Sequence, residues 1–275
     1  MKFSIVTPTR NSLDKLKRCV GSVRGQKGVM FEHIVQDACS EDGTPEWLSV
    51  QADLNWRSEN DGGMYDAINR GWRRASGDIL CWLNSDEQYL PGTLERVKNT
   101  FSRNPDIDFV FGNYIVISNT GNPIAARREI RLSKSYIANG FLNAASCTMF
   151  FRSRILADLE LDLKYRYASD MDLVLRLLDN NRKAKKIDEY LSLFTFDGSN
   201  LSCSPTMITE TREIRKKFGG SSSFTSLPYR FGRVLEKLMA GCYMRDNISY
   251  DYAIDSTPNY ITFNAKGVSQ AYITQ

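Results

Sequence analysis

Short β-rich runs alternate with amphipathic helical patterns between residues 3 and 196 of the chain. This alternation is typical of βαβ units, in which the strands are parallel and helices cover the faces of the sheet. It predicts an α/β fold with a Rossmann-like, mostly parallel twisted sheet flanked by helices. The predicted strands are 3–7, 33–37, 54–58, 79–84, 109–116, 147–152 and 190–196, and the predicted helices are 65–75, 170–178 and one that opens at Pro91 and Gly92.

The composition is that of a globular protein. The 275 residues are 42% hydrophobic and 25% charged, which suits one or two domains with a substantial core. A formal net charge of +4 gives no reason to expect a nucleic-acid partner. The N-terminus does not resemble a signal peptide, and no apolar run has the length of a membrane span. The six cysteines form no C-x-x-C pair, which favours a reduced, cytoplasmic setting.

A single histidine, His33, limits the chemistry open to the chain. Hydrolysis by a Ser-His-Asp triad would have to use that one residue, and a histidine-rich zinc site is excluded. We interpret His33 as a structural residue near the start of a strand. Carboxylates are then the expected acid–base and metal-binding groups.

The character of the chain changes near residue 204. Residues 212–245 contain eight basic and two acidic side chains, an excess larger than that of the whole chain. We therefore expect a basic helical C-terminal extension and tail at 204–275, after a main domain at 1–203, with 219–223 as a flexible joint between two helices. The basic segment has three possible interpretations. It could be a solvated charged surface, it could contact the inner face of an anionic membrane peripherally, or it could mediate self-association as a homodimer.

Asp86 and Glu87 directly follow the apolar run that begins at Ile79. Ligands of open α/β sheets bind at the carboxyl ends of strands, and two adjacent carboxylates there favour a cation between them. Mg²⁺ or Mn²⁺ that also binds a diphosphate would suit oxygen ligands of this kind. The alternative for this pair alone is a solvated acidic turn that caps the next helix.

Asp37 ends another apolar strand, which begins at His33. Its carboxylate could accept the ring N–H of a uracil or thymine. An Asx turn that ends the strand is an equally good interpretation of this residue taken alone.

Four blocks together resemble the inverting family-two glycosyltransferases with the GT-A fold, and the likeness runs from Phe3 to about Ser202. The blocks are S-I-V-T-P-T-R-N at 4–11, D-x-x-S-x-D-G-T at 37–44, D-x-G-x-Y-D-A-x-N-x-G at 61–71 and G-D-I-L-C-W-L-N-S-D-E at 77–87.

The resemblance implies a role for each block. It places Asp61 at the far side of the nucleotide site and Asp37 against the base. Asp86 and Glu87 fall on the metal-binding acidic motif, which in relatives ends in two aspartates, so Glu87 departs from the pattern. The base and ribose pocket would be lined by Thr7, Pro8 and Thr9.

The resemblance also implies a catalytic base, Asp170, in the block Y-A-S-D-M-D-L-V-L-R-L. A carboxylate at a helix start is favoured in its charged form by the helix dipole. Asp172 is the rival candidate, although it could instead pair with Arg176 one turn on. In the loop 194–202, Asn200 and Ser202 could donate hydrogen bonds to phosphate oxygens.

The function that these features imply is inverting transfer of a sugar from a UDP, GDP or dTDP sugar to a hydroxyl acceptor, with Mn²⁺ or Mg²⁺ as cofactor. The acceptor would be a glycan or a lipid-linked oligosaccharide in surface polysaccharide synthesis. A non-catalytic nucleotide-sugar binding module of the same fold is the alternative. A nicotinamide-dependent oxidoreductase is disfavoured because no G-x-G-x-x-G follows the first apolar run.

Overall fold

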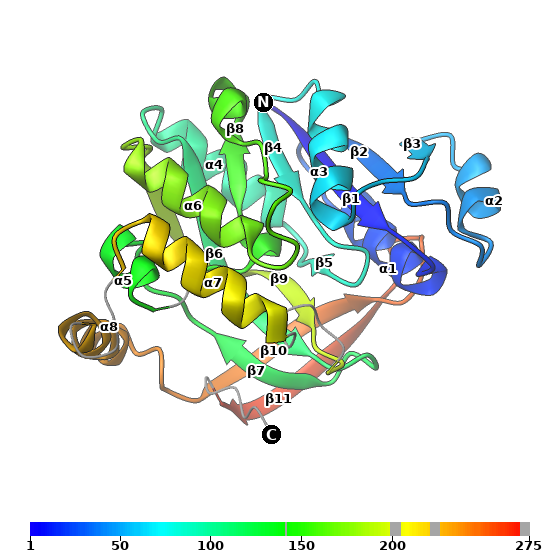
Figure 1. Cartoon of the computed structure of the whole chain (residues 1–275). Helices are drawn as coiled ribbons and strands as arrows, with labels where there is room; N and C mark the ends of the chain where they lie inside the picture. The colour runs from blue at the N-terminus through cyan, green and yellow to red at the C-terminus, as the bar shows by residue number, and fades with distance from the viewer. Residues whose placement is uncertain (141, 199–204, 221–225, 270–275) are drawn as a thin grey trace.

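The computed structural model describes residues 1–140, 142–198, 205–220 and 226–269 (Figure 1). The main sheet contains nine strands in this part of the chain, with eight in the order β3-β2-β1-β4-β8-β6-β9-β5 and β7 paired to β6. These strands are β1 (Lys2–Thr9), β2 (Met30–Asp37), β3 (Leu54–Ser58), β4 (Ile79–Trp82), β5 (Gln88–Tyr89), β6 (Phe109–Ile117), β7 (Pro123–Arg127), β8 (Phe150–Arg152) and β9 (Ala184–Thr195).

The N-terminal half of this sheet is parallel, as the alternating pattern predicts. Strand β1 pairs in parallel with both β2 and β4, and β2 pairs in parallel with β3. Strand β8 runs antiparallel between β4 and β6, so the sheet as a whole is mixed. The parallel strands bring their carboxyl ends to one edge, where the loops after β1 and β4 meet.

Helices cover both faces of the sheet (Figure 1). One face packs against α1 (Leu13–Arg24) and α4 (Thr93–Arg103), and the other packs against α3 (Met64–Arg73) and α6 (Ser169–Asp179). The stripe predicted for 65–75 is buried as expected, because Tyr65, Ile68 and Trp72 are each at most 5% exposed. The short helices α2 (Thr44–Ser49) and α5 (Lys134–Ala138) complete the fold together with the 3₁₀ turns at Ser146–Thr148 and Ser153–Asp158.

The C-terminal region is only partly helical, which differs from the sequence prediction. The expected helices are present as α7 (Pro205–Lys217) and α8 (Leu227–Met239), whereas most of the joint at 219–223 lies outside the described residues. The strands β10 (Asp246–Ala253) and β11 (Tyr260–Val268) then form an antiparallel hairpin. Strand β10 alternates apolar and polar residues, a strand pattern that the prediction of a helical extension overlooked.

The hairpin packs on the main sheet. Ile248 and Tyr250 belong to one hydrophobic cluster with Ile115 of β6 and Leu193 of β9. The predicted boundary at residue 203 remains a prediction, but the hairpin and the sheet clearly share a core.

Candidate active site

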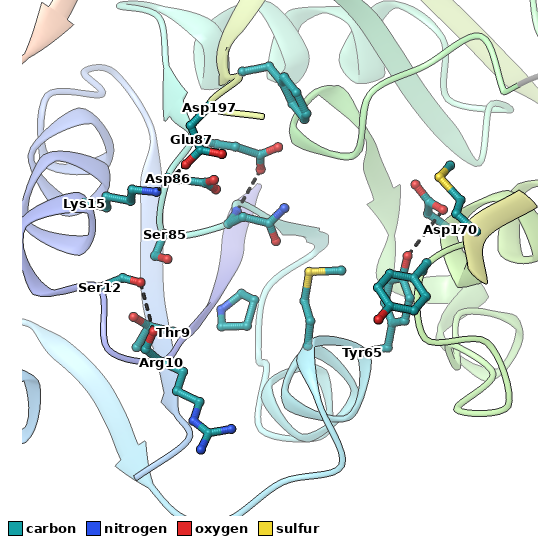
Figure 2. A pocket seen from close by; sticks show the side chains of 16 residues that line it. Thr9, Arg10, Ser12, Lys15, Tyr65, Ser85, Asp86, Glu87, Asp170 and Asp197 are labelled. Carbon is teal, nitrogen blue, oxygen red and sulfur yellow. Dashed lines mark hydrogen bonds and ion pairs between the residues drawn. The ribbon is translucent and has the colours of Figure 1, made fainter. Parts of the chain in front are cut away.

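A cavity of about 560 Å³ lies at the carboxyl ends of β1 and β4 (Figure 2). Its wall includes the loop between β1 and α1, the acidic turn after β4, and the first turns of α3 and α6. This is the edge at which open α/β sheets bind ligands. Pro8, Thr9, Asp86, Glu87 and Asp170 all line the cavity, so the fold brings together residues that the sequence analysis selected separately.

Glu87 lies in the cavity wall with its carboxylate almost fully buried. Its side chain is 1% exposed, and Oε2 accepts a hydrogen bond from the backbone N–H of Asn84 at 2.8 Å. Burial raises the pKa of Glu87, and the neighbouring charge of Asp86 raises it further. The carboxylate of Glu87 is therefore costly to ionise until a positive charge arrives.

Asp86 lies beside an ion pair between Lys15 and Asp197 (Figure 2). Lys15 Nζ of α1 is 3.1 Å from Oδ2 of Asp197, in the segment after β9. Burial raises the pKa of Asp86, the positive charge of Lys15 opposes that rise, and the negative charge of Asp197 adds to it. Thr195 donates a hydrogen bond to the backbone carbonyl of Asp86, which ties the acidic turn to β9.

The oxygen atoms of this turn suit a hard divalent cation. Asn84 Oδ1 is buried and has no hydrogen-bond partner in the described structure, and it lies near the buried carboxylate of Glu87, which the thiol of Cys147 also contacts. Unsatisfied acceptor oxygens beside a carboxylate are the donor set that Mg²⁺ and Mn²⁺ prefer. Within the described ranges, no cluster of three or more His, Cys, Asp and Glu side chains could hold a metal ion, so a diphosphate would have to supply further ligands.

Asp170 lies on the opposite side of the cavity from Asp86 (Figure 2). Its Oδ1 accepts a hydrogen bond from the backbone N–H of Met171 at 2.8 Å and faces the hydroxyl of Tyr65 at 3.4 Å. Burial raises the pKa of Asp170 to about 6, while these two hydrogen bonds oppose the rise. A carboxylate with a pKa near 6 is charged at neutral pH and is basic enough to accept a proton.

The segment before α6 is held in place by Glu210 of α7. Its carboxylate accepts hydrogen bonds from the backbone N–H groups of Arg166, Tyr167 and Ala168 at 2.9, 2.8 and 3.0 Å. These contacts fix the entry to α6 and therefore the position of Asp170.

Asp172 has a different environment from Asp170. Its side chain is fully buried and accepts contacts from Arg176 at 2.8 Å and from Lys217 at 2.7 Å. The predicted pairing with Arg176 is confirmed. Both oxygens of Asp172 face cations and Asp172 does not line the cavity, so of these two carboxylates only that of Asp170 is placed to meet a ligand there.

Thr7 does not line the cavity, in contrast to the prediction. Its side chain is fully buried, and its hydroxyl lies 2.8 Å from Nε2 of His33 and 3.7 Å from Sγ of Cys19. Thr7 lies two residues before the end of β1, where α1 covers the strand, whereas Thr9 is the last residue of β1 and reaches the cavity. Burial lowers the pKa of His33 to about 3, so this histidine is neutral and structural, as expected.

Asp37 is also held away from the cavity. Its side chain is fully buried, and its oxygens accept hydrogen bonds from the backbone and hydroxyl of Ser40 and from the hydroxyl of Ser58. This arrangement matches the Asx-turn interpretation better than a free acceptor for a base. Asp61 accepts a hydrogen bond from the N–H of Gly63 at 2.8 Å and does not line the cavity either.

Several cavity residues were missed by the sequence analysis, namely Lys15, Tyr65, Asn84 and Asp197. The sequence analysis assigned Tyr65 only to the buried face of a helix. Lys15 belongs to no motif that would have identified it as a ligand-binding residue. Asp197 lies in the loop that was flagged for Asn200 and Ser202, and those two residues lie outside the described part of the chain.

Comparison with known families decides the class of protein. The family model described as "Glycosyl transferase family 2" matches residues 4–159, which is more than half of the chain. The chain belongs to this family. The predicted enzyme class, a glycosyltransferase, is thereby confirmed.

Related proteins of known sequence are also glycosyltransferases. The chain is 31% identical over 183 residues to an uncharacterized glycosyltransferase of Mycobacterium tuberculosis, covering 63% of this chain and 67% of the relative. It is 28% identical over 188 residues to a PGL/p-HBAD biosynthesis glycosyltransferase of Mycobacterium bovis, covering 65% of this chain and 70% of that protein.

Solved structures confirm the GT-A fold of this glycosyltransferase. Residues 1–349 of S. aureus TarS, solved with UDP-GlcNAc, align with a TM-score of 0.63 at 19% identity, over 87% of this chain and 73% of that chain. A mannosyltransferase from Pyrobaculum calidifontis, solved with GDP-Man and Mn²⁺, aligns with a TM-score of 0.58 at 15% identity, over 87% of this chain and 75% of that one. Among the described helices, none is both long and apolar enough to cross a membrane.

Proposed function

We propose that the protein transfers a sugar from a nucleoside-diphosphate sugar to a hydroxyl acceptor with inversion, and that Asp170 is the general base. The observation that carries this proposal is the position of Asp170 across one cavity from Asp86, with a pKa of Asp170 raised to about 6. Inversion needs a base on the side of the sugar opposite the leaving diphosphate, and the position of these two carboxylates on opposite walls of the cavity supports that assignment.

The donor would lie with its nucleoside over Pro8 and Thr9 and its diphosphate near Asp86. Lys15 and Arg10 both line the cavity and would offset the negative charge of the diphosphate. Asp86, with Glu87 and Asn84 beside it, would hold Mn²⁺ or Mg²⁺. Such a cation stabilises the charge that develops on the departing nucleoside diphosphate.

Asp170 would accept the proton of the acceptor hydroxyl as its oxygen attacks the anomeric carbon. The hydroxyl of Tyr65 is positioned to hold the carboxylate of Asp170 in its charged form before the attack. The new bond forms between the acceptor oxygen and the anomeric carbon, while the bond from that carbon to the diphosphate oxygen breaks. No covalent enzyme intermediate is required.

The relatives narrow the substrate classes. The solved relatives were crystallised with UDP, UDP-GlcNAc and GDP-Man, so we propose a nucleoside-diphosphate sugar as donor. Named relatives act in PGL/p-HBAD biosynthesis and, for TuaG of Bacillus subtilis, putatively in teichuronic acid biosynthesis. These names support a glycan or lipid-linked acceptor in the synthesis of surface polymers.

A ligand panel followed by turnover tests the proposal. Thermal unfolding is measured with UDP, GDP and dTDP sugars, each with and without Mn²⁺, because a ligand of the native state raises the melting temperature. The donor that binds is then tested for release of its nucleoside diphosphate in the presence of candidate acceptors. Binding with turnover supports transfer, binding without turnover for every acceptor indicates a non-catalytic module, and the absence of both rejects the proposal.

A further inference from the structure

Helix α8 presents its apolar side to solvent and its charged side to the protein. None of its residues is buried. Its contacts with the rest of the chain include two ion pairs, Glu236 with Arg131 at 3.0 Å and Lys237 with Glu129 at 3.6 Å. A surface helix of a globular protein normally buries its apolar stripe and exposes its charges, so α8 is oriented the other way round.

The exposed apolar side is continuous along the helix. Phe231 is 72% exposed, Leu238 57% and Met239 82%. Tyr243 and Met244, a few residues after the end of the helix, are 49% and 64% exposed. We call this surface the α8 apolar face, and its helix residues are Leu227, Phe231, Val234, Leu235, Leu238 and Met239.

The spacing of these residues shows that α8 is amphipathic and that the α8 apolar face is a continuous stripe. They fall at positions i, i+4, i+7, i+8, i+11 and i+12, which share one side of an α-helix. Scattered exposed apolar residues are ordinary, but a contiguous apolar patch marks a surface that binds something.

Positive charge borders the α8 apolar face. A second cavity, of about 510 Å³, lies between α5 and α8, and Arg230, Arg233 and Lys237 all contribute to its wall. Burial lowers the pKa of Arg233 and that of Lys237. Burial also lowers the pKa of Arg215, and the charges of Arg230 and Arg233 lower it further. Glu129 offsets part of the charge of Arg233 and Lys237, whereas Arg230 is exposed at this border.

We propose that α8 is an interfacial helix that docks the protein on an anionic lipid bilayer. The α8 apolar face would enter the boundary between headgroups and acyl chains, and Arg230, which is exposed, would meet lipid phosphates. Thirteen residues span about 20 Å as an α-helix, so α8 is suited to lie on a membrane and not to cross it. Figure 1 shows α8 at the periphery of the molecule, where a flat surface can reach it.

The positive charge beside the α8 apolar face favours an anionic bilayer, and not a second copy of the chain, as the partner of this face. Two copies joined through the α8 apolar face would bring their cationic borders toward each other, which is unfavourable. An anionic membrane offers both an apolar layer and the opposite charge. The inference goes beyond sugar transfer and does not depend on it.

Vesicle sedimentation of the full chain tests this proposal. We expect the protein to bind vesicles that contain about one-third phosphatidylglycerol at least about tenfold more tightly than vesicles of phosphatidylcholine alone. The double substitution Phe231→Ser and Leu238→Ser should weaken binding at least about tenfold. The matched control is Met30→Ser with Val50→Ser, because these side chains are 66% and 75% exposed on distant elements, and it should bind as the unchanged protein does.

Charge and self-association are tested separately. Arg230→Glu should weaken binding to the anionic vesicles, whereas binding to neutral vesicles should not change. Equal binding by the α8 double variant and its control, or no binding of the unchanged protein to anionic vesicles, would overturn the proposal. So would sedimentation velocity that shows a dimer which the α8 double variant abolishes. A protein that binds vesicles but no nucleotide sugar would leave this inference standing while rejecting the proposed function.

Discussion

The phenolic oxygen of Tyr65 lies 3.4 Å from Oδ1 of Asp170, which joins α3 to α6 across 105 positions of sequence. Tyr65 is 5% exposed, and burial raises its pKa well above the usual value, so it remains a hydrogen-bond donor at every working pH. The pair therefore consists of a permanent donor and a carboxylate whose pKa burial has raised to about 6. This pair and the residues around it lead to five predictions.

Asp170→Asn should remove turnover and leave donor binding intact. A general base contributes about a hundredfold or more to the rate, and an amide has no proton-accepting oxygen of comparable basicity. Single-turnover sugar transfer and donor affinity measured on the same variant separate the two effects. Turnover that is unchanged would show that Asp170 is not the base.

Asp172→Asn is the matched comparison on the same helix. It leaves Arg176 and Lys217 facing a neutral amide and should lower the free energy of unfolding by about 1–3 kcal/mol.

Asp170→Asn should instead be at least as stable as the unchanged protein at pH 8. A raised native pKa means that the stabilising contribution of Asp170 is present at low pH and is lost as pH rises through about 6. Urea unfolding at pH 5 and pH 8 measures both.

The rate of transfer should rise with pH through a midpoint near 6, because only the ionised form of Asp170 is a base. Tyr65→Phe removes a hydrogen bond that lowers this pKa, so the midpoint should move to higher pH. The measurement is kcat against pH for both proteins at saturating donor. A downward shift, or none, would contradict the assigned role of Tyr65.

Lys15→Met should raise the KM for the donor about tenfold, because it removes a charge that faces the diphosphate region and pairs with Asp197. Lys17→Met is the control on the same helix, since Lys17 does not line the cavity and its partner Asp14 is largely exposed. Initial rates at varied donor concentration compare the two. If both variants raise KM equally, a local role for Lys15 is rejected.

Mn²⁺ should strengthen binding of the nucleoside diphosphate, and Asp86→Asn should abolish most of that gain. The variant removes the carboxylate that the structure places in the cavity beside Glu87 and Asn84. Titration calorimetry with and without EDTA measures the effect. Asp14→Asn, at a carboxylate that is largely exposed, should keep the full Mn²⁺ dependence.

The strands and their ends could be predicted from local pattern. Strand periodicity and the polar residues that follow each apolar run located β1 and β4, and with β4 also Asp86, whereas Pro8 and Thr9 were assigned through the family resemblance. Asp170 needed the family resemblance, because a carboxylate in the first turn of a helix is also an ordinary helix start. The prediction of a helical extension at 204–275 missed the strands β10 and β11, which follow the basic segment that ends at Arg245, and β5 and β7 of the main sheet were not predicted either.

The sequence by itself determined which segments become strands and helices and which acids stand at their ends, because those properties depend on residues close together in the chain. Only the tertiary structure decided which of those polar side chains share a cavity. It buried Thr7 under α1, satisfied Asp37 with Ser40 and Ser58, and brought Lys15 to Asp197 over 182 positions. Side-chain depth and long-range pairing depend on how helices pack on the sheet, and no local pattern encodes that packing.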